Sequence, residues 1–148
     1  MNKQKGFTII ELIVVIAIIA VLAAIVLVNV TSYINKGKDA AIKGNLSSAM
    51  TNGAVYFDSN GNYTAFCATQ TATTLAAADA AWGTGGTAAI CLANTSVDGT
   101  TPIGGQWCAC KQEKVDTAKY FCVDSSGKKI DSATACATEC VAATGKCL

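Results

Sequence analysis

The sequence predicts an α+β protein. One long amino-terminal α-helix, whose first half spans a membrane, should pack on a small head made of an antiparallel β-sheet and crosslinked by disulfides. Three observations predict this architecture. Residues Phe7 to Val28 form an apolar run with a single charge, Glu11. A helical period of three and four residues continues to Phe57. Beyond it, short strand-like segments alternate with eight cysteines, which is typical of a small head with a disulfide framework.

The apolar run is long enough to cross a bilayer, which takes about 20 residues of helix. A short polar leader precedes it, with Lys3 and Lys5 as its only charges, in keeping with the positive-inside tendency. An ordinary secretory signal places its small-residue cleavage site after the apolar core. Here the natural boundary, Gly6, comes before that core. We therefore expect a membrane segment whose cleavage site lies at its amino-terminal boundary.

Glu11 lies inside the run, where charged groups are expensive and usually functional. Cleavage after Gly6 would make Phe7 the new amino terminus, about one helical turn from Glu11. The new ammonium and the carboxylate would then neutralise each other, within one subunit or between neighbours, where an unpaired buried charge costs several kcal/mol. The alternative is that Thr8 and Glu11 only form a capping box, S/T-x-x-E before an apolar run.

The stretch GFTIIELIVVIAIIAVLA, which begins at Gly6, resembles the amino-terminal signature of type IV pilins and pseudopilins, the class III prepilin-type signal. The resemblance extends to about residue 66, because GAVYFDSNGNYTAF is similar to the end of that family's long helix and its following turn. It implies that a prepilin peptidase cleaves after Gly6 and methylates Phe7, and that Glu11 is needed for assembly. The partners it implies are an assembly platform with a motor ATPase, other pilins, and further copies of this chain in a homo-polymer.

Four regions follow from these patterns: a cleaved leader (1–6), a transmembrane and assembly helix (7–28), an amphipathic continuation of that helix (29–57) and a Cys-rich globular head (58–148). Neither glycine nor proline occurs from Glu11 to Asn29. The sequence therefore predicts one continuous helix from about Phe7 to about Phe57. The run Asp58 to Asn62 has the residues that stop a helix and make a turn.

The amphipathic continuation should pack on the head through its apolar positions, which are Val30, Ile34, Ala41, Ile42, Leu46, Ala49, Met50, Tyr56 and Phe57. Its charged residues fall mainly between those positions: Lys36, Lys38, Asp39 and Lys43. Either a solvated face or a contact with a neighbouring subunit fits them. Each of three glycines weakens the helix by about 1 kcal/mol relative to alanine, and we interpret them as positions of close helix approach: Gly37, Gly44 and Gly53.

In the head, residues 64–89 are rich in Ala, Thr and Gly and are more typical of a variable surface loop than of a core. Within them, residues 74–83 have the cap and the final glycine of a short helix. Strand-like segments follow at 87–92, 106–111, 118–124 and 128–131. Ser125-Ser126-Gly127 turns the chain between the last two, as in a hairpin.

The cysteines all fall in the predicted exported head: Cys67, Cys91, Cys108, Cys110, Cys122, Cys136, Cys140 and Cys147. Their even number in an exported domain predicts disulfides. A metal site is the competing interpretation, but no C-x-x-C pair exists and the compartment is oxidising. We expect Cys67 to pair with Cys91, and Cys147 to pair with Cys136 or Cys140. Cys108 and Cys110 share one strand face and should have different partners.

The composition argues against catalysis. The chain has no histidine, and all its cations are lysines, so the commonest general base, the commonest metal ligand and the bidentate phosphate clamp are missing. The acidic residues are scattered singly. We expect no enzyme activity, no metal and no cofactor. Without Lys3 and Lys5, nine lysines face ten acidic residues, a net charge of −1, which gives nucleic acid little to bind.

These observations together predict the structural subunit of a type IV pilus-like extracellular filament, made as a single-pass precursor in the cytoplasmic membrane. A first alternative is a pseudopilin of a type II secretion system. A second is a membrane-tethered Cys-rich binding domain that does not polymerise. Purified surface fibres would separate the last alternative from the others, whereas filament length in cells and neighbouring genes would separate the first two.

Overall fold

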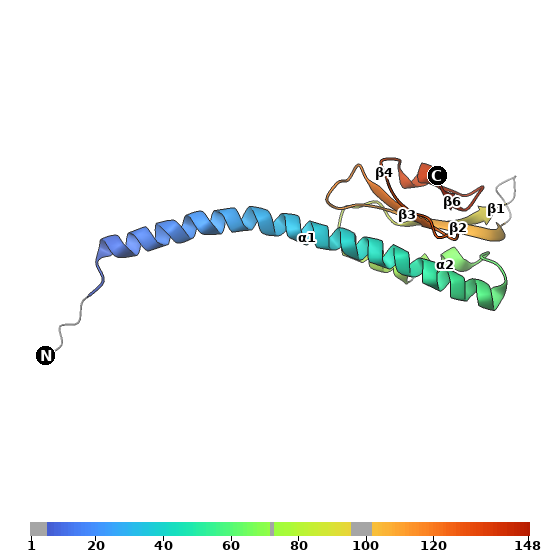
Figure 1. Cartoon of the computed structure of the whole chain (residues 1–148), viewed down its shortest axis with the longest axis horizontal. Coiled ribbons are helices and arrows are strands. Elements are labelled where there is room, and N and C mark those ends of the chain that lie inside the picture. The colour runs from blue at the N-terminus through green and yellow to red at the C-terminus, as the bar shows by residue number, and fades with distance from the viewer. Residues whose placement is uncertain (1–5, 72, 96–101) are drawn as a thin grey trace. The chain divides into compact units, whose positions relative to one another are not determined.

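The structure, a computed structural model, describes residues 6–71, 73–95 and 102–148 (Figure 1). The chain divides into two compact units, Met1–Ile34 and Asn35–Leu148. The elements in chain order are α1 (Ile9–Asn60), α2 (Phe66–Thr71), α3 (Thr74–Trp82), β1 (Ile90–Thr95), β2 (Pro102–Gln112), β3 (Tyr120–Asp124), β4 (Lys129–Ser132), α4 (Cys136–Glu139), β5 (Cys140–Val141) and β6 (Lys146–Cys147). The predicted α+β class is confirmed.

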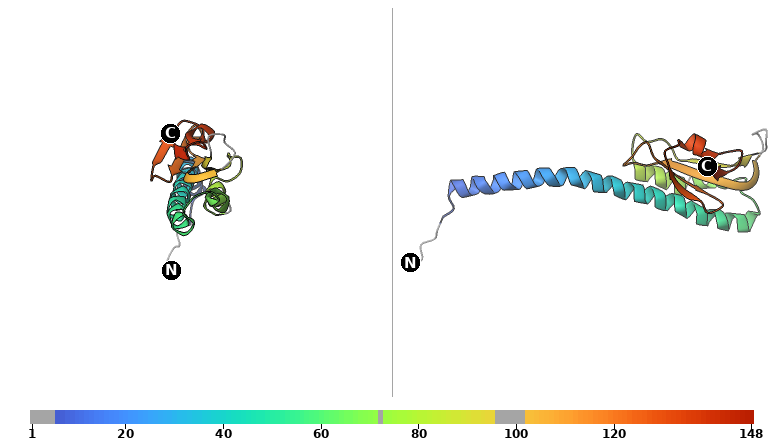
Figure 2. Two further views of the ribbon diagram at one scale, coloured as in Figure 1. Left: turned by 90° about the vertical axis from the view of Figure 1, so that its right-hand side faces the viewer. Right: turned by 45° about the horizontal axis from the view of Figure 1, so that its top comes forward.

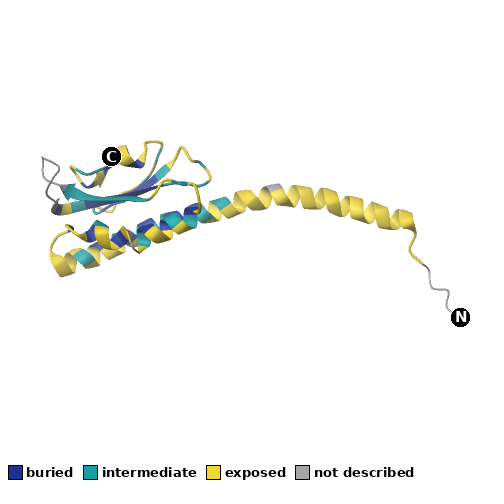
Figure 3. Cartoon of the chain, turned by 180° about the vertical axis from the view of Figure 1, so that it is seen from behind, coloured by how far each residue is buried: buried dark blue, intermediate teal, exposed yellow. Residues whose placement is uncertain are grey.

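Helix α1 is continuous over 52 residues, as the absence of breakers predicts. It ends at Asn60 rather than near Phe57, because the helical backbone bonds continue to the one from Gly61 N to Phe57 O. Ser59 and Asn60 also donate side-chain hydrogen bonds to carbonyls of the preceding turn. The turn predicted at 58–62 therefore begins only at Gly61, whose φ of 70° is the left-handed conformation that glycine adopts readily. Figure 3 shows the amino-terminal part of α1 exposed and buried residues from its later turns onward.

The head contains a four-stranded antiparallel sheet in the order β1-β2-β3-β4. Strand alternation places Trp107 and Ala109 on the face toward the helices, and Cys108 and Cys110 on the opposite face. Figure 2 shows the sheet with helices along one face and the end of the chain along the other. The predicted turn at residues 125–127 joins β3 to β4.

The observed strand boundaries differ from the predicted ones where backbone groups form hydrogen bonds with side chains instead of with a neighbouring strand. The first strand starts at Ile90 rather than residue 87, because Thr87 O accepts a hydrogen bond from Lys111 and Ala89 N donates one to Asp79. The third starts at Tyr120 rather than residue 118, because Ala118 N donates to the side chain of Asp116.

The helix-facing core confirms part of the predicted packing face of α1, since Ile42, Leu46 and Ala49 are fully buried in it and Met50 and Tyr56 pack against it. The prediction was wrong for four positions, which are exposed: Val30, Ile34, Ala41 and Phe57. The interpretation of residues 64–89 as more loop than core was wrong. Phe66 of α2 and Trp82 of α3 are buried in the same cluster, and the ring of Phe66 lies 4.6 Å from that of Trp107. Isolated aromatic residues in an Ala/Thr-rich segment gave no periodic signal, yet they supply much of the apolar area that this core buries.

The opposite face of the sheet is covered by residues 136–148, which we call the carboxy-terminal cover. Three disulfides join it to the sheet: Cys108–Cys140, Cys110–Cys136 and Cys122–Cys147. The predicted bond from Cys147 to Cys136 or Cys140 was wrong. Cys140 and Cys147 do lie opposite each other across the β5–β6 hairpin, but each sulfur bonds to a sheet cysteine instead. The predicted Cys67–Cys91 bond is confirmed.

Charged residues of α1 that were assigned to a solvated face or a subunit contact are bonded within the head. Asp39 is only 8% exposed, and its carboxylate accepts hydrogen bonds from the backbone amides of Lys114 and Val115. Lys43 Nζ lies 2.8 Å from Glu113 Oε1 and 2.6 Å from Asp131 Oδ1. These contacts fix the end of β2 and the loop after it against α1.

The position of the Trp107 ring explains why residue 53 of α1 is a glycine. A Cβ on Gly53 would lie 2.7 Å from Trp107 Nε1 and against the indole ring, whereas a Cβ on Gly44 would meet nothing within 4 Å. Gly53→Ala should therefore lower the free energy of unfolding by about 1–3 kcal/mol through overpacking. Gly44→Ala should raise it by about 1 kcal/mol through helix propensity. Urea unfolding of both variants checks this pair, and equal effects of the same sign would contradict the close contact at Gly53.

Glu113 predicts a pH effect on stability. Burial raises the pKa of Glu113 despite the nearby Lys43, whereas the bond from Lys43 lowers the pKa of Asp131. Because the folded pKa of Glu113 exceeds its usual 4.5, this residue makes stability fall as pH rises from that value through the raised pKa. Glu113→Gln removes this component, so the stability of the variant relative to wild type should increase across that window.

Urea unfolding midpoints measured over a pH series test the expectation. Asp116→Asn is the control, because Asp116 is half-exposed and its ion pair with Lys119 is looser, at 3.5 Å. A difference between Glu113→Gln and wild type that stays constant with pH would show that the titration of Glu113 does not contribute.

Candidate functional site

The start of α1 holds the predicted assembly residue in a capping box. Glu11 Oε2 accepts hydrogen bonds from Thr8 N and Thr8 Oγ1, both at 2.8 Å, and Thr8 Oγ1 accepts one from Glu11 N at 3.2 Å. The bonds satisfy amides that the first turn of a helix leaves without partners. The capping box was the alternative reading of these residues, and the structure contains it.

The predicted cleavage junction is open. Phe7 is 86% exposed, a Cβ added to Gly6 would meet nothing within 4 Å, and both residues precede α1 in irregular backbone. Such a junction is accessible to a protease, because a cleaved peptide bond must leave helical structure to enter an active site. Residues 1–5, which contain the rest of the expected leader, lie outside the described residues.

The two readings of Glu11 are chemically compatible. In the uncut chain the carboxylate binds the amide and hydroxyl of Thr8, the residue next to Phe7. A carboxylate accepts several hydrogen bonds at once. Cleavage after Gly6 would convert the Phe7 amide into an ammonium on the residue next to Thr8, whose amide and hydroxyl already bind the Glu11 carboxylate. The capping box and the predicted pairing of Glu11 with an ammonium therefore do not exclude each other.

The rest of the unit Met1–Ile34 is an apolar surface wherever the structure describes it. From Ile9 onward its large aliphatic side chains are exposed along α1. Within the described residues, α1 is the helix that is long and apolar enough to cross a membrane. Asn29 and Thr31 donate side-chain hydrogen bonds to carbonyls one turn back, so these two donors are paired within the helix, which is favourable in an apolar environment.

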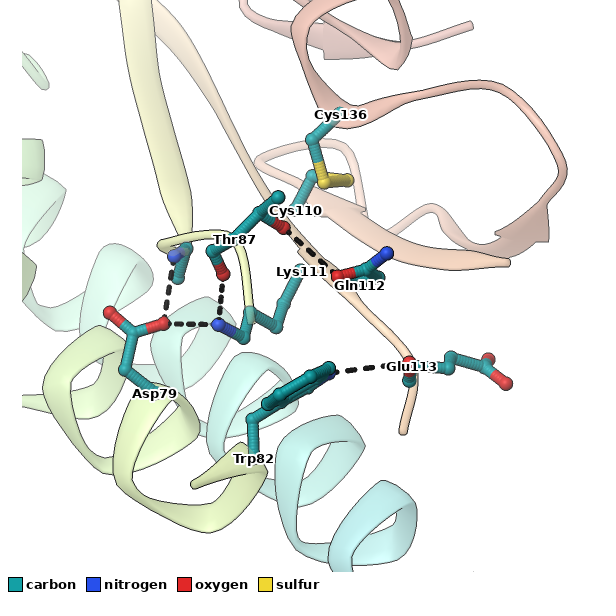
Figure 4. A network of polar contacts seen from close by, with 9 residues as sticks. Asp79, Trp82, Thr87, Cys110, Lys111, Gln112, Glu113 and Cys136 are labelled. Carbon is teal, nitrogen blue, oxygen red and sulfur yellow. Dashed lines mark hydrogen bonds and ion pairs between the residues drawn. A yellow bond between two sulfur atoms is a disulfide. The ribbon is translucent and has the colours of Figure 1, made fainter. Parts of the chain in front are cut away.

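In the head, polar side chains form structural contacts that the sequence analysis missed. Lys111 is 2% exposed, and its Nζ contacts Asp79 Oδ1 at 2.5 Å and the carbonyl of Thr87 (Figure 4). Trp82 Nε1 donates to the carbonyl of Glu113 in the same region. These bonds tie α3 and the loop after it to β2. No motif signals such a pair, because its members lie far apart in the sequence.

All eight cysteines are oxidised in four disulfides. Their sulfurs are therefore not available as thiolate ligands. In the described part of the chain, no group of three or more acidic or sulfur side chains is placed to hold a metal ion.

The comparison with protein families places a known motif on the site. The family model described as prokaryotic N-terminal methylation motif matches residues 1–27, which include the junction, Thr8 and Glu11. No curated protein and no solved structure matches the chain. The motif is the class III prepilin-type signal, whose family is structural rather than enzymatic. The chain thus carries a prepilin-type signal, which supports a type IV pilin or pseudopilin-like protein.

Proposed function

We propose that this chain is the structural subunit of a type IV pilus-like extracellular filament. The observation that carries the proposal is the match of residues 1–27 to the methylation motif, on a helix whose exposed apolar surface holds one carboxylate near the Gly6–Phe7 junction. An apolar helix of this length is stable in a bilayer. Outside the bilayer it needs an apolar partner, and sister helices of the same kind supply one.

The proposed sequence of events follows from that surface. The precursor inserts as a single-pass membrane protein with residues 1–6 as its leader, and a prepilin peptidase cuts after Gly6 and methylates Phe7. Residues 7–28 then leave the membrane as they pack into a bundle with the same segment of neighbouring subunits. An assembly platform and a motor ATPase drive this transfer. Residues 29–57 connect the bundle to the head, residues 58–148, which forms the outside of the filament.

Glu11 has the assembly role in this proposal. A carboxylate that leaves water for an apolar bundle requires a cation, because an unpaired buried charge costs several kcal/mol. The ammonium of Phe7 in the same or a neighbouring subunit is that cation. Since each subunit supplies one ammonium and one carboxylate, the pairing is repeated at every step of a growing helical bundle and sets the register of the new subunit.

Purified surface fibres test the proposal. Fibres sheared from cells should contain this chain as their repeating component, and its intact mass should correspond to a chain that starts at Phe7 with one added methyl group. Gly6→Leu should leave full-length precursor in the membrane and no fibres. A mature chain that starts at Met1, or downstream of the apolar run, would contradict the proposal. Short periplasmic assemblies without surface fibres would favour a pseudopilin, and a processed chain that never polymerises would favour a tethered binding domain.

A further inference from the structure

Asn62 begins an N-x-S/T triplet, which is the acceptor sequence for N-linked oligosaccharides in exported proteins. The triplet, Asn62-Tyr63-Thr64, lies in the connection between α1 and α2 (Figure 1). Asn62 and Thr64 are exposed, whereas Tyr63 between them is only 8% exposed. The two side chains that the acceptor sequence requires, the amide of residue 62 and the hydroxyl of residue 64, therefore belong to accessible residues on either side of a buried one.

Tyr63 holds this connection against the core. Its ring lies 5.8 Å from the ring of Phe66, and its backbone amide donates a hydrogen bond of 2.6 Å to Gly104 O. Next to it, Thr64 N donates to Asn62 Oδ1 at 3.0 Å, which closes an Asx turn. The fold therefore presents the triplet as an ordered surface turn, so an enzyme that binds it in this form loses little ordering entropy.

The acceptor nitrogen of Asn62 has room for a new bond without loss of the turn. Asn62 Nδ2 donates a hydrogen bond of 3.1 Å to Asn60 O. An amide nitrogen carries two hydrogens, and the attachment of a sugar replaces one of them, so the other can still bind Asn60. Asn62 Oδ1, which accepts the bond from Thr64 N, takes no part in the new linkage. The modified side chain is thus compatible with the observed turn.

The structure separates this triplet from the other three in the chain, which begin at Asn29, Asn45 and Asn94. Asn29 and Asn45 lie inside α1, and Asn94 lies in β1 with Oδ1 bonded to Gln106 N at 3.0 Å. Ser96, the last residue of the third of these triplets, lies outside the described residues. A triplet in a regular helix or a paired strand must unfold locally before it can enter an active site. The turn after α1 is free of that cost.

We propose that Asn62 carries an N-linked oligosaccharide, which an oligosaccharyltransferase transfers from a polyprenyl-linked glycosyl phosphate on the outer face of the membrane. Asn62 Nδ2 attacks the anomeric carbon of the first sugar and gives up one proton to a base of the enzyme. The bond from that carbon to the phosphate oxygen breaks, and the polyprenyl-linked phosphate leaves with the electron pair. The products are an amide N-glycoside and the lipid phosphate. This modification goes beyond the filament role and requires only that the head is exported.

The oligosaccharide would protect an exposed part of the head. Phe57 is 43% exposed, and its ring lies 5.0 Å from the ring of Tyr63 in the middle of the triplet. Gly61, next to Asn62, is exposed in the turn that ends α1. N-linked sugars are bulky and solubilising, and exposed turns are preferred sites of proteolytic cleavage. A glycan on Asn62 therefore shields both the aromatic ring and the turn.

The test begins with the full chain isolated from membranes and surface material of its native cells. Its intact mass should exceed that of the polypeptide by the mass of one oligosaccharide. Fragmentation of the proteolytic peptides by electron transfer, which leaves sugars attached, should place this mass on residue 62. The peptides that contain Asn29, Asn45 and Asn94 should have the masses of the unmodified sequence.

Variants of the same triplet separate the modification from a structural role. Asn62→Asp keeps an oxygen that can accept the bond from Thr64 N but has no amide nitrogen, so it should lose the oligosaccharide. Thr64→Val keeps the backbone amide of the Asx turn and lacks only the hydroxyl, so it should lose the oligosaccharide as well. Thr64→Ser retains a hydroxyl and should retain the modification. Asn94→Asp, the matched control at another triplet, should leave the added mass unchanged.

Three results would overturn the proposal: an exported chain with the mass of the polypeptide alone, an oligosaccharide that persists in Asn62→Asp, or one that persists in Thr64→Val. Oxidised cysteines identify the exported chain in the first case. Failure of the proposed function would give a different result. A chain that never polymerises would still carry the oligosaccharide in the membrane fraction, and a chain without it could still be recovered from fibres.

Discussion

Replacing Glu11 with alanine should yield a chain that inserts into the membrane and is processed normally, yet is absent or scarce in filaments. Removing a carboxylate from an apolar segment makes insertion easier, since an acidic residue at the centre of a membrane helix costs about 2.5–3.5 kcal/mol. The same change removes the partner of the Phe7 ammonium, which then enters the apolar bundle unpaired. Membrane fractionation, intact-mass analysis and the yield of sheared fibres measure these three properties separately.

Thr8→Val is the control that separates pairing from capping. In the structure both the amide and the hydroxyl of Thr8 donate to Glu11. Valine retains the amide but lacks the hydroxyl, so this variant weakens the capping box by about 1 kcal/mol and keeps the carboxylate. We expect fibres from Thr8→Val at near-normal yield. Normal yield from Glu11→Ala would contradict the pairing role, and equal losses from the two variants would show that capping is what assembly requires.

Removing the Cys122–Cys147 disulfide should destabilise the head more than removing Cys67–Cys91. The two bonds close loops of nearly equal length, with sequence separations of 25 and 24, so loop entropy predicts about the same loss for each, roughly 3 kcal/mol. Their surroundings differ. Cys122 and Cys147 are buried among the other disulfides that hold the carboxy-terminal cover, whereas Cys67 and Cys91 are half-buried. The first pair therefore loses packing as well as its crosslink.

Double alanine variants at each pair, compared by urea unfolding and by protease resistance, measure this difference. We expect Cys122→Ala with Cys147→Ala to release the carboxy-terminal cover to protease, and Cys67→Ala with Cys91→Ala to leave the cover protected. Reduction of all four bonds should unfold the head while the apolar part of α1 remains helical in detergent. Equal unfolding midpoints for the two double variants would show that loop closure alone accounts for the contribution of each bond.

Features encoded in local sequence were predicted well. The apolar period fixes Ile42, Leu46 and Ala49 in the core, the absence of breakers gives a continuous α1, and the Ser125–Gly127 turn sets the β3–β4 hairpin. The motif at the candidate site could likewise be recognised from the sequence, because Gly6, Phe7, Thr8 and Glu11 lie within one short stretch, and the roles of these residues stay predictions. Local spacing carries this information because helix turns, hairpins and capping boxes bring together residues that are close in the chain.

Features that depend on contacts between residues far apart in the chain could not be predicted from the sequence. The pairing of Cys147 with Cys122 depends on which face of the β5–β6 hairpin meets the sheet. Asp39 has no local sign that it will accept bonds from amides far along the chain, at Lys114 and Val115. The burial of Phe66 and Trp82 likewise follows from where α2 and α3 pack, since Ala/Thr-rich helices have little periodic contrast.

The carboxy-terminal cover has a mechanical consequence for a subunit under tension. Its three disulfides span overlapping stretches of chain, 108–140, 110–136 and 122–147. A pulling force on this region can separate the strands only until the disulfide bonds carry the load. The residues enclosed by each disulfide cannot then extend, so they add almost nothing to the length of the stretched chain. Hydrogen bonds that break under the force can form again quickly, because the disulfides keep the donor and acceptor segments close together. A filament built from such heads would yield elastically under load and regain its shape when the load is removed.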